Sequence, residues 1–157
     1  MRWLDIARSD IGLRELPGAP TAPKIAGWLK ALGAWWRDDA TPWCGTAVAA
    51  WMRSAGIPIP GAWYRAKAWA TWGQALSYPA EGCIVVFERA GGGHVGLITG
   101  EDHAGRLLVL GGNQGDAVSI ASFGRDRVIA YRWPPGEPLP GQMQLARGTA
   151  PVSTSEA

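Results

Sequence analysis

TPWCGTAVAAWM, residues 41–52, places Cys44 where an apolar helix is expected to begin. Pro42 and the acidic pair Asp38 and Asp39 are start signals, and apolar residues at three- and four-residue spacing give the helix one face to bury. A thiol there meets the positive end of the helix dipole and unpaired N–H groups, which favour the thiolate. The stretch therefore predicts a nucleophilic cysteine, or else the small buried hydrophobe that a lone cysteine at a helix start commonly is.

The length and the charge of the chain limit the classes of protein to which it can belong. Its 157 residues are enough for one domain with a real core and leave no room for a second catalytic domain. The net charge of +2, without a run of Lys or Arg, does not indicate nucleic acid as a partner. No apolar run reaches the ~18 residues of a membrane span, and Asp5 stands where a signal peptide would be apolar. We therefore expect no membrane insertion, and synthesis in the cytoplasm without a signal peptide.

Tryptophan is unusually frequent in this chain. Ten tryptophans exceed what a core of this size needs. Exposed indole faces can stack on sugar rings or bury a peptide, although a core position is the alternative for each of them. Cys44 and Cys83 do not make a disulfide framework, and we expect Cys83 to be a half-buried residue at the start of a strand, not bonded to Cys44.

The hydrophobic period changes from helical to strand-like near residue 80. In addition to the helix that begins at Cys44, helices are expected at residues 2–10, 24–32 and 64–74. Runs rich in β-forming residues follow at 83–87, 94–99, 107–110, 118–120 and 128–131. This order predicts an α+β fold in which N-terminal helices pack on an antiparallel β-sheet of about five strands. Residues 1–133 would form the domain, and residues 134–157, rich in Pro, Gly and Ser, would form a tail.

A thiolate nucleophile needs a base, and the chain has two histidines. His94 follows three glycines and starts an apolar strand, so its ring is expected to project from the end of the sheet. His103 lies in the polar turn EDHAG and is expected to be a solvated loop residue. Asn113, one strand after His94, can reach across paired strands and fix the imidazole tautomer, or can simply make the turn beside glycine. Gln114, in the same turn, is the second candidate for the residue that fixes the imidazole tautomer.

These motifs together resemble a known family. PWC (42–44) opening a helix, GCIVVF (82–87), GHVGLI (93–98) and GGNQ (111–114) resemble the CHAP and NlpC-type papain-like peptidases that cut bacterial peptidoglycan, and most closely small phage-associated lysins. The resemblance spans about residues 5–133. It implies a papain-like fold with Cys44 as nucleophile, His94 as base and Asn113 as orienting residue. Relatives often carry an acid where Gly111 stands, which leaves Asn113 to orient His94 alone.

The resemblance implies a peptidoglycan hydrolase that cleaves amide bonds of the stem peptide by a Cys–His–Asn mechanism. No cofactor is implied. Some relatives bind calcium through acids upstream of the cysteine, but Asp38 and Asp39 alone fall short of the six or more oxygen ligands needed. An open groove beside the site would hold the glycan or the stem peptide, and the residues expected to bind substrate there are Trp35, Trp36, Trp43, Trp63 and Gln114.

Other functions would use the same catalytic site or the same groove. An N-acetylmuramoyl-L-alanine amidase would use the same site on the glycan–peptide bond, and an acyltransferase or a delivered antibacterial toxin would need an amine acceptor or an immunity protein. A catalytically dead cell-wall binding module would keep only the groove, and the complete set of Cys44, His94 and Asn113 argues against it. We expect a monomer that acts on bacterial peptidoglycan at the cell wall or periplasm, brought there by a phage or a secretion system through a possible delivery protein.

Overall fold

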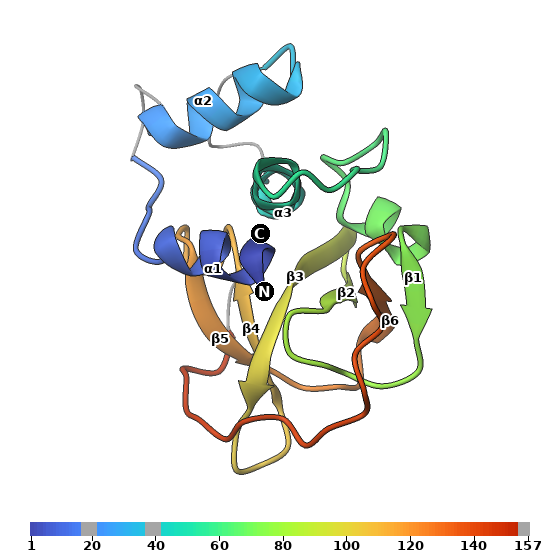
Figure 1. Ribbon diagram of the computed structural model, residues 1–157. Coiled ribbons are helices and arrows are strands. Elements are labelled where there is room, and N and C mark those ends of the chain that lie inside the picture. Colours follow the sequence, from blue (N-terminus) through green and yellow to red (C-terminus); the bar gives the residue numbers. More distant parts are fainter. Residues whose placement is uncertain (17–21, 37–41, 154–157) are drawn as a thin grey trace.

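Three α-helices precede a six-stranded antiparallel sheet in the computed structural model, which describes residues 1–16, 22–36 and 42–153 (Figure 1). The α+β class predicted from the sequence is confirmed. A short strand, which the sequence did not predict, follows a 3-10 helix in the region expected to be a fourth α-helix. The elements are α1 (Arg2–Ser9), α2 (Pro23–Leu32), α3 (Cys44–Ser54), η1 (Ala66–Thr71), β1 (Gln74–Leu76), β2 (Ile84–Arg89), β3 (Gly92–Glu101), β4 (Leu107–Gly111), β5 (Ser119–Phe123) and β6 (Val128–Trp133).

The sheet has the strand order β1-β6-β2-β3-β4-β5. Strands β2 to β5 form a meander, and β6 returns to pair with the free side of β2. In the β2–β3 hairpin Phe87 lies opposite His94, and in the next pair Leu97 lies opposite Leu110. This register brings the start of β3 and the end of β4 to the same end of the sheet. His94 and the turn after Gly111 are therefore neighbours.

Helix α3 is the central helix of the domain. It packs on β3 and β4, while α1 and α2 pack on α3 (Figure 1). Every residue from Cys44 to Met52 is buried, as expected for a helix that is covered on all sides. Asp10, at the end of α1, accepts hydrogen bonds from Trp51 Nε1 of α3 at 2.9 Å and from Lys24 Nζ of α2. This carboxylate fixes the three helices relative to one another.

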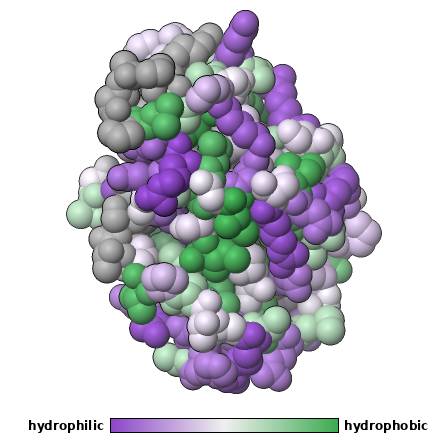
Figure 2. Space-filling model, turned by 90° about the vertical axis from the view of Figure 1, so that its left-hand side faces the viewer, coloured by the Kyte–Doolittle hydropathy of each residue, from purple (hydrophilic) through white to green (hydrophobic). Residues whose placement is uncertain are grey.

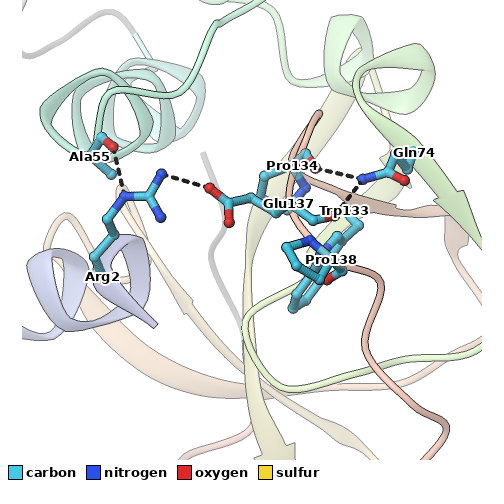
Figure 3. Close-up of polar contacts among 7 residues, drawn as sticks. All are labelled: Arg2, Ala55, Gln74, Trp133, Pro134, Glu137 and Pro138. Atoms are coloured by element: carbon cyan, nitrogen blue, oxygen red, sulfur yellow. Dashed lines mark hydrogen bonds and ion pairs between the residues drawn. The ribbon is translucent and has the colours of Figure 1, made fainter.

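The segment after β6 lies against the domain. Trp133 Nε1 donates to Pro138 O at 2.9 Å, and Gln74 Nε2 donates to the carbonyl oxygens of Pro134 and Glu137 (Figure 3). Arg2 of α1 joins the same region, because its guanidinium donates to Glu137 Oε1 at 2.6 Å and to the end of α3 at Ala55 O (Figure 3). These contacts join the N-terminal helix and the segment just after β6 to β1.

The same segment continues to the opposite edge of the sheet. A parallel bridge joins Glu101 to Arg147, and another joins Ser122 of β5 to Val152. Ser122 N donates to Pro151 O, and Ser153 N donates to Ser122 O, both at 2.9 Å. Because β5 is the last strand in the order, residues 151–153 cover its outer edge. The sequence set residues 134–157 apart as a tail, and residues 134–153 of it are docked on the domain.

The surface on the side of α1, α2 and β5 mixes polar and apolar side chains, with an apolar patch near its middle (Figure 2). None of the helices in the described part of the chain combines the length and the apolar character needed to cross a bilayer.

Candidate active site

Cys44 is the first residue of α3, and Trp43 is its N-cap. The prediction that the cysteine opens a helix is confirmed. The side chain is largely buried, yet it lines a cavity of about 320 Å³ that opens to the surface. The backbone N–H groups of Gly45, in the same turn, and of Val95, in β3, help to lower the pKa of its thiol. A helix start and a strand therefore supply the donors that a thiolate needs.

His94 lies inside the sheet rather than projecting from its end. Its imidazole is fully buried and stacks on Phe123, with ring centroids 5.4 Å apart and planes 11° apart. Phe87, its register partner in β2, lies on the same stack at 6.3 Å. The expectation of an uncrowded ring is wrong, because β5 and β2 both place a phenyl ring beside it. Packing on these rings fixes the orientation of the imidazole and keeps water from its faces.

The imidazole of His94 lies beside the Cys44 thiol, close enough to act on its charge. Burial raises the pKa of the Cys44 thiol, but the hydrogen bond to His94 and the charge of the imidazolium lower it, helped by the N–H groups of Val95 and Gly45. The lowering contributions prevail, so the pKa lies below that of an ordinary thiol. A thiol whose pKa is lowered by a neighbouring imidazole is what a cysteine nucleophile requires.

Gln114 makes the contact that the sequence assigned to Asn113. Its Oε1 lies 2.9 Å from His94 Nε2, and its Nε2 donates to Val109 O at 3.0 Å and to Ser119 O at 2.8 Å. The two carbonyl acceptors fix which end of the amide faces the histidine, so that Oε1 accepts a hydrogen bond from the Nε2–H of the ring. The other ring nitrogen, Nδ1, is thereby left to serve the thiol.

Asn113 is turned away from His94. Its Oδ1 accepts from Trp43 N at 2.8 Å, and its Nδ2 donates to Glu15 Oε1 at 3.1 Å. Trp43 Nε1 donates to the same Glu15 oxygen at 2.6 Å. Asn113 also has a φ of 61°, the left-handed conformation that Asn tolerates better than most residues. Its contacts thus make it an anchor for the start of α3, and Glu15 is part of that anchor.

Gly111 explains why Gln114 can reach the histidine. A Cβ built at position 111 would collide with Gln114 Oε1 and would lie 3.4 Å from His94 Nε2. The amide of Gln114 therefore occupies the space into which a side chain at 111 would point. The lack of a side chain at 111 is the feature of the sequence that leaves this space beside His94 to Gln114.

Three of the four expected tryptophans gather beside the cysteine. Trp35, which is 88% exposed, the half-buried Trp36 and the buried Trp63 line a cavity of about 490 Å³ together with Tyr64. Trp36 stacks on Trp63 with ring centroids 6.0 Å apart. Pro42 and Tyr64 line both this cavity and the one at Cys44, so the two cavities adjoin.

Trp43 does not line either cavity. Only 1% of it is exposed, and its ring packs against Trp28 with centroids 6.4 Å apart. The expectation that Trp43 binds substrate in the groove is therefore wrong. As the N-cap of α3, this residue faces the core and the Glu15 carboxylate.

Cys83 and His103 lie away from this site. Cys44 and Cys83 are both free thiols. Cys83 is fully buried rather than half-buried, and burial raises the pKa of its thiol to about 12. His103 is exposed in the turn between β3 and β4, as expected of a solvated loop residue. The calcium site considered for Asp38 and Asp39 falls outside the described residues, and within those residues no three His, Cys, Asp or Glu side chains are placed to hold a metal.

A central helix that begins with a cysteine and packs on an antiparallel sheet carrying the histidine is the architecture of the papain-like class. The family model described as CHAP domain matches residues 36–113. The chain thus carries a CHAP domain, and the match includes Cys44, His94 and Asn113. No curated protein matches the chain. CHAP domains are peptidoglycan hydrolases, acting as amidases or peptidases, and this places the activity of the chain at the bacterial cell wall.

Proposed function

We propose that the chain hydrolyses amide bonds of peptidoglycan with Cys44 as nucleophile, His94 as acid and base, and Gln114 as the residue that orients His94. The observation that carries this proposal is the contact between the Cys44 thiol and the His94 imidazole, with the thiol pKa lowered by it. The CHAP match supports the substrate. The proposal keeps the nucleophile and base expected from the sequence and moves the orienting role from Asn113 to Gln114.

The proposed reaction proceeds through a thioester. The Cys44 thiolate attacks the carbonyl carbon of the substrate amide, and the backbone N–H of Cys44, in the first turn of α3, stabilises the resulting oxyanion. The His94 imidazolium gives its proton to the amide nitrogen, the C–N bond breaks, and the amine leaves. Neutral His94 then takes a proton from water, whose oxygen attacks the thioester carbonyl. The acid product leaves, and the thiolate–imidazolium pair is restored.

Within peptidoglycan, our preferred bond is an amide of the stem peptide. The cavity at Cys44 is bordered by Gly91, Gly92 and Gly93, whose lack of side chains leaves room for an extended peptide. A second candidate is the amide between the glycan and the peptide, as in an N-acetylmuramoyl-L-alanine amidase. The adjoining cavity lined by Trp35, Trp36 and Trp63 favours this alternative, since flat aromatic faces stack on sugar rings. On either proposal a phage or a secretion system would deliver the protein to the wall.

Digestion of purified peptidoglycan tests the proposal. We expect new amino groups and no new reducing sugar, because glycosidic cleavage needs a pair of carboxylates and not a thiolate. Mass spectrometry of the fragments separates cleavage within the stem peptide from cleavage between glycan and peptide. Cys44→Ala should release no new amino groups from either kind of amide bond. Cys83→Ala, which changes the other free thiol, should keep the activity. Reducing ends without new amines would overturn the proposal, and binding without any product would indicate a dead binding module.

A further inference from the structure

The cavity that contains Cys44 is lined by cations. Arg65 and Lys67, at the start of η1, and Arg89, at the end of β2, contribute to its wall. No Asp or Glu is among the described residues that line it. The chain as a whole has a net charge of only +2, so three cations around one cavity are a local concentration of charge. A cleft lined by charge of one sign raises the local concentration of oppositely charged ligands.

The two arginines are held in place without an acidic partner. Arg89 donates Nε to Gly93 O at 2.9 Å, across the β2–β3 hairpin, and the Arg65 guanidinium lies 5.7 Å from the centre of the Tyr64 ring. Among the residues that the structure describes, no carboxylate forms an ion pair with either of them. Lys67 pairs with Glu88 at 2.8 Å, but both side chains are about half exposed, and such surface pairs contribute little.

Glycines keep this cationic wall accessible. A Cβ at Gly91 or Gly92 would meet no atom within 4 Å, so the hairpin tip borders open space. A Cβ at Gly93 would lie 2.9 Å from Lys67 Cγ, so the missing side chain lets the lysine stem cross the hairpin. The nucleophile and the three cations thus share one accessible cavity.

We propose that Arg65, Lys67 and Arg89 form a subsite that binds a free carboxylate of the peptide substrate next to the bond cut by Cys44. This inference rests on the proposed function. Arginine pairs with carboxylates through parallel hydrogen bonds, and it stays charged at every relevant pH. The stem peptide of peptidoglycan carries free carboxylates, while in some walls these groups are amidated. The subsite therefore selects stem peptides by their amidation state and favours the acidic form.

A matched pair of muramoyl tripeptides tests the subsite. One carries free carboxylates, and the other carries carboxamides at the same positions. We expect kcat/KM of the wild type to be about tenfold higher for the acid, the size of one charge-assisted interaction. The preference should shrink as salt is raised, because Arg65 and Lys67 are exposed and Arg89 is only half-buried, so that salt screens them. The double variant Arg65→Gln/Arg89→Gln should lose the preference, so that its kcat/KM values for the two peptides become equal. Lys30→Gln, an exposed position on α2, controls for net charge and should keep the preference.

Binding to Cys44→Ala, measured by calorimetry with the same two peptides, separates this inference from the proposed function. Hydrolysis of both peptides at equal rates, with equal binding, would overturn the subsite and leave the hydrolase standing. Tighter binding of the acid to Cys44→Ala, lost in the arginine variants, would support the subsite even if wild type hydrolysed neither peptide. Failure of the hydrolase itself would show separately, as no release of new amino groups from intact peptidoglycan. A preference that survives in Arg65→Gln/Arg89→Gln would also refute the subsite.

Discussion

Replacing Gln114 separates its contact with His94 from its contacts with the backbone. Gln114→Met removes the acceptor 2.9 Å from His94 Nε2 and the two hydrogen bonds to Val109 O and Ser119 O. Gln114→Glu keeps an oxygen toward His94 and loses the same two donated bonds. With about 1–3 kcal/mol for each buried group left unpaired, the loss of these two bonds should cost both variants roughly 2–6 kcal/mol of unfolding free energy. They differ mainly in what faces the imidazole.

Activity is then expected to follow the histidine contact and not the stability. A hydrogen bond to a charged partner contributes about 1.5–3 kcal/mol, so kcat/KM of Gln114→Met should fall about ten- to a hundredfold below that of Gln114→Glu. The pH profile gives a second measure. Without an acceptor on Nε2 the imidazolium is less stable, so the alkaline limb should move to lower pH in Gln114→Met, whereas a carboxylate should move it to higher pH.

The assay is initial-rate hydrolysis of peptidoglycan, normalised to the folded fraction from chemical denaturation. Asn113→Gly is the matched control, because glycine accepts the φ of 61° and removes only the contacts to Trp43 N and Glu15. It should lose stability, with a smaller effect on kcat and no shift of the alkaline limb. Equal kcat/KM in Gln114→Met and Gln114→Glu would refute the orienting role. A shifted limb in Asn113→Gly would restore the assignment made from the sequence.

Three further outcomes are expected. Iodoacetamide near neutral pH should label Cys44 and spare Cys83, because the pKa of the Cys44 thiol is lowered while burial raises that of Cys83 to about 12. Mass spectrometry of the peptides would show the difference, and faster labelling of Cys83 would contradict the proposed site. His94→Ala should abolish hydrolysis and the exposed His103→Ala should not, and a large loss in the second variant would mean that the wrong histidine was chosen. Trp35→Ala should change stability by less than about 0.5 kcal/mol, since its ring is 88% exposed, yet raise KM on intact wall, and an unchanged KM would remove this ring from the substrate groove.

Helices and strands were predictable from the sequence where the local hydrophobic pattern matches the packing of the element in the fold. The apolar run after Cys44 is a helix that is buried on all sides, and the runs bounded by Gly and Asn became β2 to β6. β1 was missed because three residues are too few to show a period. The docking of residues 134–153 was missed because much of it uses backbone groups, such as Pro134 O and Pro151 O, which composition does not reveal.

In the site, the position of a side chain was easier to predict where the local sequence determines it than where it depends on the conformation of a turn. Cys44 at a helix start and His94 at a strand start followed from the chain itself. The choice between Asn113 and Gln114 depended on the turn after β4, where the φ of 61° at Asn113 sends two adjacent side chains in different directions. Trp43 was misplaced for a similar reason, since the sequence could not show that Glu15 and Asn113 hold it in the core.

The segment along β5 also has a consequence for synthesis on the ribosome. An outer strand with unpaired N–H and C=O groups is a template for pairing with another chain. Part of the outer edge of β5 is covered only when residues 151–153 arrive, about thirty positions after the strand itself, so the nascent domain carries that edge uncovered while the last segment is still being made. Versions trimmed after β6 would keep the edge uncovered permanently, and self-association at high concentration would be their characteristic failure.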